Sequence, residues 1–431
     1  MTRINPAEVL KAADHFADAN GFAAQTYQGL KDVLGGHGQM AGDDQTSEDF
    51  AAEYDGAAAD FMGAFADLVG ALGGLARLVY LTAGNHRNAN LASVYSENPP
   101  VYSGGQFDAP PGTTVTVAAS RPPSVVGGDD PDTPELWDQI TDYLEGWTWP
   151  GADTGRLRSA GESWRQVDSM FDTMLAPYVD AALGELRKQD SEDIDLAIGV
   201  IEDLKLEIDE LGHQAAELGA ACDAYAQQVD DVKEVVKGIL RDLAIEVGIS
   251  IGVGIVVGIF TAGIGAGGGA AIAGWRLASA ARKVIHAFSA MKAVVKAGAV
   301  AKILTVARRV PILGRRFRRV SEAANRARHE RYVDQLRAAM GKPATRDPKL
   351  TDLMDELYRD NAKVGSGSTA AAVRHELATG QLVGGRSHVQ KAENMITALQ
   401  RWLRNHPDAT PGDRAAAENV IRDMQNALAG N

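Results

Sequence analysis

The chain has 431 residues, enough for roughly two to four domains that each bury a core of their own. Aromatic residues make up only 6% of it and glycine is abundant, so the composition favours helices over sheet. The single cysteine, Cys222, excludes an internal disulfide framework and any zinc site built on paired thiolates, and we expect it to be buried. We therefore predict an all-α protein.

The formal net charge of -14 is distributed unevenly along the chain. Residues 276–329 contain 14 Lys and Arg and one acid, Glu322, which leaves a net charge of -27 on the other residues. Such a separation predicts that the two parts meet different partners, or meet each other. Residues 1–20 lack the apolar stretch of a signal peptide, so we do not expect export by the general secretory route.

Residues 1–97 are predicted to form a helical hairpin, because apolar residues recur at spacings of three and four in two segments. The first segment contains Val9, Ala13, Phe16 and Ala17, and the second contains Phe50, Tyr54, Ala57, Ala58, Phe61 and Leu68. A turn rich in helix breakers lies between them. Residues 98–133 follow with three Pro-Pro pairs, and we expect an extended linker without a fixed fold.

Residues 134–246 are predicted to form an elongated antiparallel bundle of long helices. The evidence is heptad-like apolar spacing at Leu204, Ile208, Leu211, Ala215 and Leu218. A breaker sequence, Trp149-Pro150-Gly151-Ala152-Asp153, interrupts the first part of this region, and a helical pattern resumes at Leu157.

The segment from Trp149 to Asp153, with Leu157-Arg158 and Trp164-Arg165, resembles the start of WXG-type helical-hairpin domains. The N-terminal hairpin is similar, with Gly42-Asp43-Asp44 in place of the tryptophan turn. These domains stand at the front of actinobacterial type VII secretion substrates and large polymorphic toxins. The resemblance implies export by that machinery, with a small helical-hairpin chaperone as a partner. Two features depart from the family pattern: the Trp-x-Gly turn opens a helix, and Asp230 lies one position too far from Tyr225 for the export signal.

Residues 247–275 form a glycine-rich apolar segment without a formal charge, longer than the roughly 20 residues that a membrane-spanning helix needs. Ten of these 29 residues are glycine, which lowers helix propensity by about 1 kcal/mol each relative to alanine. Three interpretations therefore stay open: permanent spanning, insertion on delivery, and burial inside the carrier.

Residues 276–358 are predicted to form a basic helical segment and a linker. Its cations stand beside apolar residues in a pattern that suits anionic lipid headgroups. The cations are Arg276, Lys283, Lys292, Lys296 and Lys302, and the apolar residues are Val284, Ile285, Phe288, Val294 and Val295. Nucleic acid would also be attracted, and a solvated face that neutralises the acidic body is the third alternative. Because the basic residues directly follow the apolar segment, we favour lipid over nucleic acid for residues 276–329. Together with that segment they predict a membrane contact through residues 247–329.

Residues 359–431 are predicted to form a compact module of three helices. The first opens at Ser366 to Thr369 and ends at Gly380. The second opens at Ser387, with Gln390 completing a capping-box pattern, and the third opens at Thr410-Pro411. Apolar stripes on the three helices can close one small core.

The chemistry of this module concentrates between Gly384 and Lys391. His388 and Lys391 lie one turn apart at the start of the second predicted helix, where free amides and the helix dipole attract phosphate and favour a neutral imidazole. A neutral imidazole can act as a general base, and Arg386 and Lys391 can hold a phosphate. RNA supplies its own nucleophile, the 2'-hydroxyl, so we expect an RNA substrate and no metal or other cofactor. The alternative is a surface histidine that only caps the helix.

The same module resembles the C-terminal toxin modules of polymorphic and contact-dependent growth-inhibition systems. The matching residues are Gly365 to Ala370, Arg374-His375-Glu376, Thr379-Gly380, Val383 to His388 with Lys391, and Asp413-Arg414 to Asn426-Ala427-Leu428. The resemblance implies an RNase that cleaves transfer RNA, a cognate immunity protein, and in some members a translation elongation factor as helper. The catalytic candidates are His388, Lys391, Arg386 and Thr369. The substrate-binding candidates are Ser368, Arg374, His375, Gly384, Gly385 and Ser387.

The sequence thus predicts a secreted antibacterial toxin that acts in the cytoplasm of a competitor through a metal-independent endoribonuclease at its C-terminus. The alternative is a membrane-active or pore-forming toxin that acts through residues 247–329.

Overall fold

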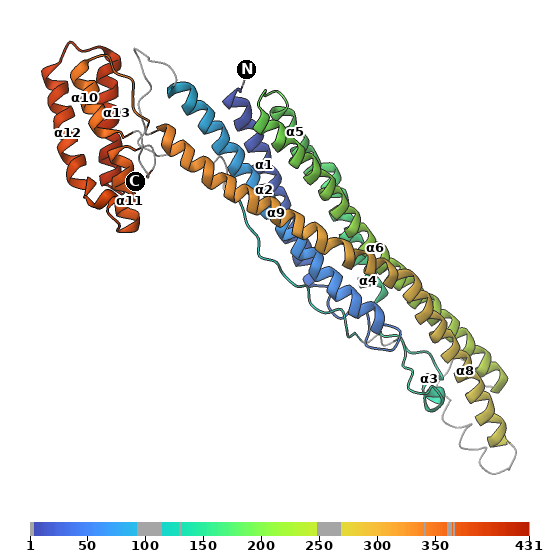
Figure 1. The fold of residues 1–431 in the computed structure, drawn as a ribbon. Helices are drawn as coiled ribbons and strands as arrows, with labels where there is room; N and C mark the ends of the chain where they lie inside the picture. Colours follow the sequence, from blue (N-terminus) through green and yellow to red (C-terminus); the bar gives the residue numbers. More distant parts are fainter. Residues whose placement is uncertain are drawn as a thin grey trace.

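A computed structural model describes residues 4–92, 114–128, 132–247, 269–339, 341–359, 364 and 367–430. Within these ranges every regular element is a helix, and extended segments pair only through isolated bridges. The predicted all-α fold is therefore confirmed. Figure 1 shows a long helical bundle and, beyond its last helix, a smaller helical module that contains the C-terminus.

The bundle is built from long helices, the short α3, one 3-10 turn (η1) and two π-helical turns (η2 and η3). Its elements are α1 (Pro6–Gly35), α2 (Glu48–Ala92), α3 (Trp137–Ile140), η1 (Thr141–Tyr143), α4 (Thr154–Met170), η2 (Phe171–Leu175), α5 (Ala176–Leu186), α6 (Glu192–Val247), α8 (Gly269–Val295), η3 (Lys296–Val300) and α9 (Ala301–Ala339). Local signals fix the helix starts: the Asn5 side chain accepts from the Ala7 amide before Pro6 opens α1, and Asp153 caps α4 in the same way.

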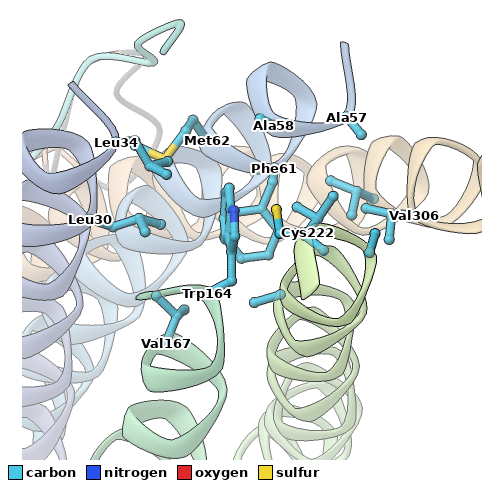
Figure 2. Close-up of a cluster of buried hydrophobic side chains, with 14 of the residues drawn as sticks. Leu30, Leu34, Ala57, Ala58, Phe61, Met62, Trp164, Val167, Cys222 and Val306 are labelled. Atoms are coloured by element: carbon cyan, nitrogen blue, oxygen red, sulfur yellow. The ribbon is translucent and has the colours of Figure 1, made fainter. Parts of the chain in front are cut away.

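One continuous hydrophobic core runs through the bundle, from Val9 on α1 to Phe317 on α9. Figure 2 shows side chains from α1, α2, α4, α6 and α9 converging around Trp164. The Trp164 indole packs edge-on against Phe61 and donates a 2.8 Å hydrogen bond to the Tyr54 hydroxyl. Cys222 is fully buried here, as predicted, and burial raises the pKa of its thiol to about 12. The predicted hairpin, bundle and basic segment therefore share one core and do not form separate units.

The turn between α1 and α2 meets the segment before α4. The Asp44 carboxylate accepts from the Gly151 amide at 2.9 Å, and the Asp153 amide donates to the Met40 carbonyl at 3.0 Å. A Cβ on Gly151 would lie 2.9 Å from the Gly128 carbonyl oxygen, so only glycine allows this approach. The Trp-Pro-Gly segment thus joins two distant turns of the chain.

Residues 114–128, which belong to the predicted linker, have a defined conformation. Residues 114–128 are extended and run along α1, where the Asn20 side chain bonds to both the amide and the carbonyl of Val115. The Tyr27 hydroxyl donates to the Ala118 carbonyl at 2.8 Å, and the Ala41 amide donates to the Val125 carbonyl. The expectation of no fixed fold was wrong for these residues, because side chains of α1 satisfy their backbone groups.

The basic segment packs against the acidic body. Val284, Phe288 and Val295 are buried, so this apolar face turns inward. Its cations form ion pairs across the bundle: Lys292–Glu48, Lys296–Asp49, Lys302–Glu217, Arg316–Glu207 and Arg318–Asp67. Of the alternatives for this segment, the structure favours mutual neutralisation over a free lipid-binding face at Lys292, Lys296 and Lys302. The glycine-rich segment lies mostly outside the described residues, which resume at Gly269.

The C-terminal module has a second hydrophobic core and contains one helix more than the three predicted from residues 359–431. Its helices are α10 (Pro348–Leu357), α11 (Thr369–Thr379), the short η4 (Val383–Gly385), α12 (His388–Asn405) and α13 (Pro411–Leu428). Leu350, Met354 and Leu357 of α10 are buried in this core. Helix α10, which lies before the predicted boundary at 359, therefore packs its apolar face against α12 in this core.

Two carboxylates, the buried Asp413 and the partly exposed Asp347, hold the start of the module. Asp413 accepts from the backbone amides of Arg346 and Asp347, at 2.7 and 3.2 Å. Asp347 caps α10 through the Leu350 amide and also accepts from the Trp402 indole at 3.1 Å. The Leu350 amide, together with the Trp402 indole, lowers the pKa of Asp347 despite its partial desolvation. These contacts join α10, α12 and α13 into one C-terminal module, whose described residues lie between 341 and 430.

Candidate active site

The candidate site lies where α11 ends and α12 begins. Gly380 ends α11 in the left-handed conformation, and a loop through Gly384 and Gly385 leads to His388, the first residue of α12. Both loop glycines have positive φ and are exposed. A Cβ on either glycine would meet nothing within 4 Å, so the loop faces open space.

The central interaction of the site joins His388 to Glu376 of α11. The His388 ring Nδ1 lies 2.7 Å from Glu376 Oε1, and the His388 backbone amide donates to Glu376 Oε2 at 2.9 Å. The Val383 amide also donates to this carboxylate, at 3.1 Å. The Glu376 side chain is 6% exposed and the His388 side chain 22%, so the carboxylate is enclosed while the imidazole reaches solvent.

Two opposing effects act on Glu376. Burial raises the pKa of its carboxyl, but the hydrogen bonds from the His388 amide, the His388 ring and the Val383 amide outweigh burial and lower the pKa overall. Glu376 is therefore ionised at neutral pH and can only accept hydrogen bonds. It follows that His388 Nδ1 carries a proton toward Glu376, which leaves the Nε2 lone pair free when the imidazole is neutral.

The start of α12 is capped differently from the sequence prediction. Ser387 occupies the N-cap position, but its side chain makes no capping hydrogen bond. Glu376, reaching across from α11, takes that role at the His388 amide. The capping-box interpretation was wrong, and this amide is not available to a phosphate because an internal carboxylate already occupies it. Anion binding here depends on side chains instead.

Lys391 lies one turn into α12, beside the C-terminal end of α10. Its Nζ donates to the Glu356 carbonyl at 2.7 Å. Burial lowers the pKa of its ammonium, and the charge of Arg359 lowers it further. Arg386 is exposed in the loop before His388. The structure thus brings His388, Arg386 and Lys391 to the same end of α12.

Three of the other candidates make contacts within the module. Thr369 is buried and donates its hydroxyl proton to the Leu357 carbonyl at 3.2 Å, while Ser368 caps α11 through the Ala371 amide. Arg374 forms a 2.8 Å ion pair with Asp423 of α13, and both side chains are largely buried. His375 is half-buried on α11.

Glu376 is the residue that the sequence analysis missed. It was named in the Arg374-His375-Glu376 triplet without a role of its own. The available signal was an acid one turn before a helix-ending glycine, followed by a glycine-rich loop into a second helix. Among the described residues, no group of three or more His, Cys, Asp and Glu side chains is arranged to hold a metal ion.

Comparison with known proteins gives a partial likeness. The chain is 28% identical over 233 residues to outer membrane channel protein CpnT of Mycobacterium tuberculosis (strain ATCC 25618 / H37Rv), and equally to that of Mycobacterium bovis (strain BCG / Pasteur 1173P2). The aligned stretch covers 54% of this chain and 27% of each relative, so the chain spans about a quarter of their length. No protein-family model matches the chain, and no solved structure matches it.

One described helical stretch, Glu48–Gly84 within α2, is long and apolar enough to cross a membrane. It is a core helix in this structure: 61% of its most apolar window is buried inside the bundle.

Proposed function

We propose that the chain is a secreted toxin whose C-terminal module is a metal-independent endoribonuclease, with transfer RNA as its substrate. The observation that carries the proposal is the contact between His388 and Glu376: a buried carboxylate holds a solvent-accessible imidazole, next to exposed Arg386 and to Lys391. The similarity to proteins named as outer membrane channels supports a role outside the cytoplasm of the producing cell.

The proposed reaction uses the 2'-hydroxyl of the RNA. The free Nε2 of His388 accepts the hydroxyl proton, and the resulting oxygen attacks the neighbouring phosphorus. Arg386 and Lys391 bind the phosphate oxygens and stabilise the charge that develops on them. The bond from phosphorus to the 5' oxygen breaks, and that oxygen takes a proton from Lys391, whose lowered pKa makes it the better acid. The products carry a 2',3'-cyclic phosphate and a 5'-hydroxyl.

The partners of the proposed toxin follow from its resemblance to secreted polymorphic toxins. We propose delivery by type VII machinery, with or without a helical-hairpin chaperone, and action in the cytoplasm of the target cell. A cognate immunity protein protects the producer, and a translation elongation factor assists cleavage. Each partner is testable by co-expression with the module.

Induction of residues 341–431 in bacteria tests the proposed activity. We expect growth arrest, shortened transfer RNA on a denaturing gel, and intact membranes. His388→Asn should abolish both effects. His406→Asn is the matched control, because His406 lies in the same module but stacks on Trp402. RNA that stays intact during growth arrest would contradict the proposal.

A second candidate function is membrane permeabilisation through residues 247–329, which the name of the relatives favours. Dye leakage from liposomes caused by residues 1–340, without the C-terminal module, would support it. In the structure, residues 276–329 would first have to leave their ion pairs with Glu48, Glu207 and Glu217.

A further inference from the structure

Helix α9 lies along the bundle surface with its two flanks bound to neighbouring helices (Figure 1). On one flank Lys302 and Arg316 form ion pairs with Glu217 and Glu207 of α6, at 2.7 and 2.9 Å. On the other flank Arg318 pairs with Asp67 of α2 at 3.0 Å. The buried side of the helix contributes Ile303, Val306, Val310 and Phe317 to the core. Three sides of α9 are therefore committed to the bundle.

The fourth side carries a row of arginines. Arg308, Arg315, Arg319 and Arg326 are separated by seven, four and seven residues, so they share one helical face. All four are exposed, and none has an ion-pair partner among the described residues. At 1.5 Å per residue the row extends for about 27 Å. We call these four residues the arginine crest.

We propose that the arginine crest docks the folded bundle onto an anionic phospholipid surface. Guanidinium groups bind phosphate oxygens in a bidentate manner, and a row of them along one helical face can contact several headgroups at once. The acidic remainder of the chain is repelled by the same surface, which favours the orientation that turns the crest toward it.

One apolar residue favours lipid over nucleic acid as the occupant. Ile312 is 40% exposed and lies on the same face between Arg308 and Arg315. An apolar side chain among cations fits the boundary between headgroups and acyl chains. A phosphate backbone offers it no comparable environment.

This docking differs from insertion of residues 247–275, because it needs no change in the folded bundle. It also differs from the lipid face first expected at Lys292, Lys296 and Lys302, which are paired with acids. It is independent of the proposed nuclease, since none of the four arginines belongs to the C-terminal module.

Vesicle co-sedimentation of the full chain tests the proposal. The probes are vesicles of phosphatidylcholine alone and of phosphatidylcholine mixed with phosphatidylglycerol. The test variant replaces Arg308, Arg315, Arg319 and Arg326 by Gln. The control variant removes the same charge at four exposed cations on other helices: Lys11, Lys31, Arg241 and Arg282. Circular dichroism and thermal melting verify that both variants are folded.

We expect the wild type and the control variant to bind the anionic vesicles and not the neutral ones, with binding that weakens as salt rises. The crest variant should bind on the order of 100- to 1,000-fold more weakly, because each basic residue near an anionic surface contributes about 1 kcal/mol. Equal losses in both variants, no binding by the wild type, or crest-dependent binding to RNA but not to vesicles would each overturn the proposal.

Discussion

The bundle and the C-terminal module use charge in opposite ways. In the bundle, most ion pairs lie at the surface and join neighbouring helices, and the interior around Trp164 is apolar, although Asp44 and Lys233 are buried. In the module, the carboxylates of Asp413, Asp423 and Glu376 are buried at helix ends and between helices. Exposed ion pairs contribute little to stability. When one partner of a buried ion pair is removed, the other charge stays in the protein interior without a partner, which is strongly destabilising. The surface ion pairs of the bundle should therefore tolerate substitution, whereas the buried carboxylates of the module should not.

The largest expected effect concerns the extent of the module. Deleting α10 removes Leu350, Met354 and Leu357 from the small core, and losses of about 2–5 kcal/mol for each such side chain exceed the total stability of most small domains. We expect residues 341–431 to fold alone and residues 359–431 to be unfolded. Thermal unfolding and amide dispersion in NMR spectra measure this. A cooperative transition in the shorter fragment would show that α10 is dispensable.

The second effect compares two arginines. Arg374→Ala should destabilise the module by about 3 kcal/mol, because the carboxylate of Asp423 is then buried without its partner. Arg187→Ala should cost the bundle less than about 1 kcal/mol, because both side chains of its ion pair with Glu202 are exposed, at 54% and 50%. Urea unfolding of each variant gives both values. Similar losses would break the contrast between the two regions.

Arg374 also shows what sequence patterns could and could not predict. Local signals were read correctly: Gly380 ends α11, Thr410 caps α13, and the apolar stripes of α12 and α13 close a core. The contacts that decide each polar residue's role come from distant parts of the chain. Asp423 lies 49 residues after Arg374, so no local pattern separates a structural arginine from a substrate-binding one.

The same limit explains the other corrections. Ser387 fits a capping box, yet the cap comes from Glu376 on another helix. The proline-rich linker has no helical or strand pattern of its own, and Asn20 and Tyr27 order it from α1. The basic segment neutralises Glu207 and Glu217, which lie about a hundred residues earlier. Local periodicity was enough to predict which segments are helices. It could not predict which distant residues their polar side chains contact.

The third prediction concerns the pH dependence of the module. The folded state lowers the pKa of Glu376 below its ordinary value of 4.5, so its ionisation stabilises the fold above that pH. This contribution is lost as pH falls below about 4.5 and through the folded-state pKa. Glu376→Gln should destabilise the module by about 1–3 kcal/mol at pH 7 and flatten the acid limb of the stability curve.

Urea unfolding of residues 341–431 from pH 7 to pH 3 measures that curve. Some acid dependence should remain in the Gln variant, because the pKa of Asp347 is lowered as well, chiefly by the Leu350 amide. An unchanged acid limb would show that Glu376 is not ionised against His388 in the way described.

The smallest effect separates two serines. Ser368→Ala removes the cap of α11 and should cost about 1 kcal/mol, because the Ala371 amide loses its acceptor. Ser387→Ala should change stability by less than about 0.5 kcal/mol, because its side chain makes no capping bond. Thermal unfolding of the two variants resolves the difference, and the reverse order would restore the capping-box interpretation.

The most direct test of the central claim is cleavage of purified transfer RNA by purified residues 341–431 in the presence of excess EDTA. We expect fragments that end in 2',3'-cyclic phosphate, with cleavage lost in His388→Asn and retained in His406→Asn. An uncleaved substrate, or cleavage that His388→Asn leaves unchanged, would contradict it.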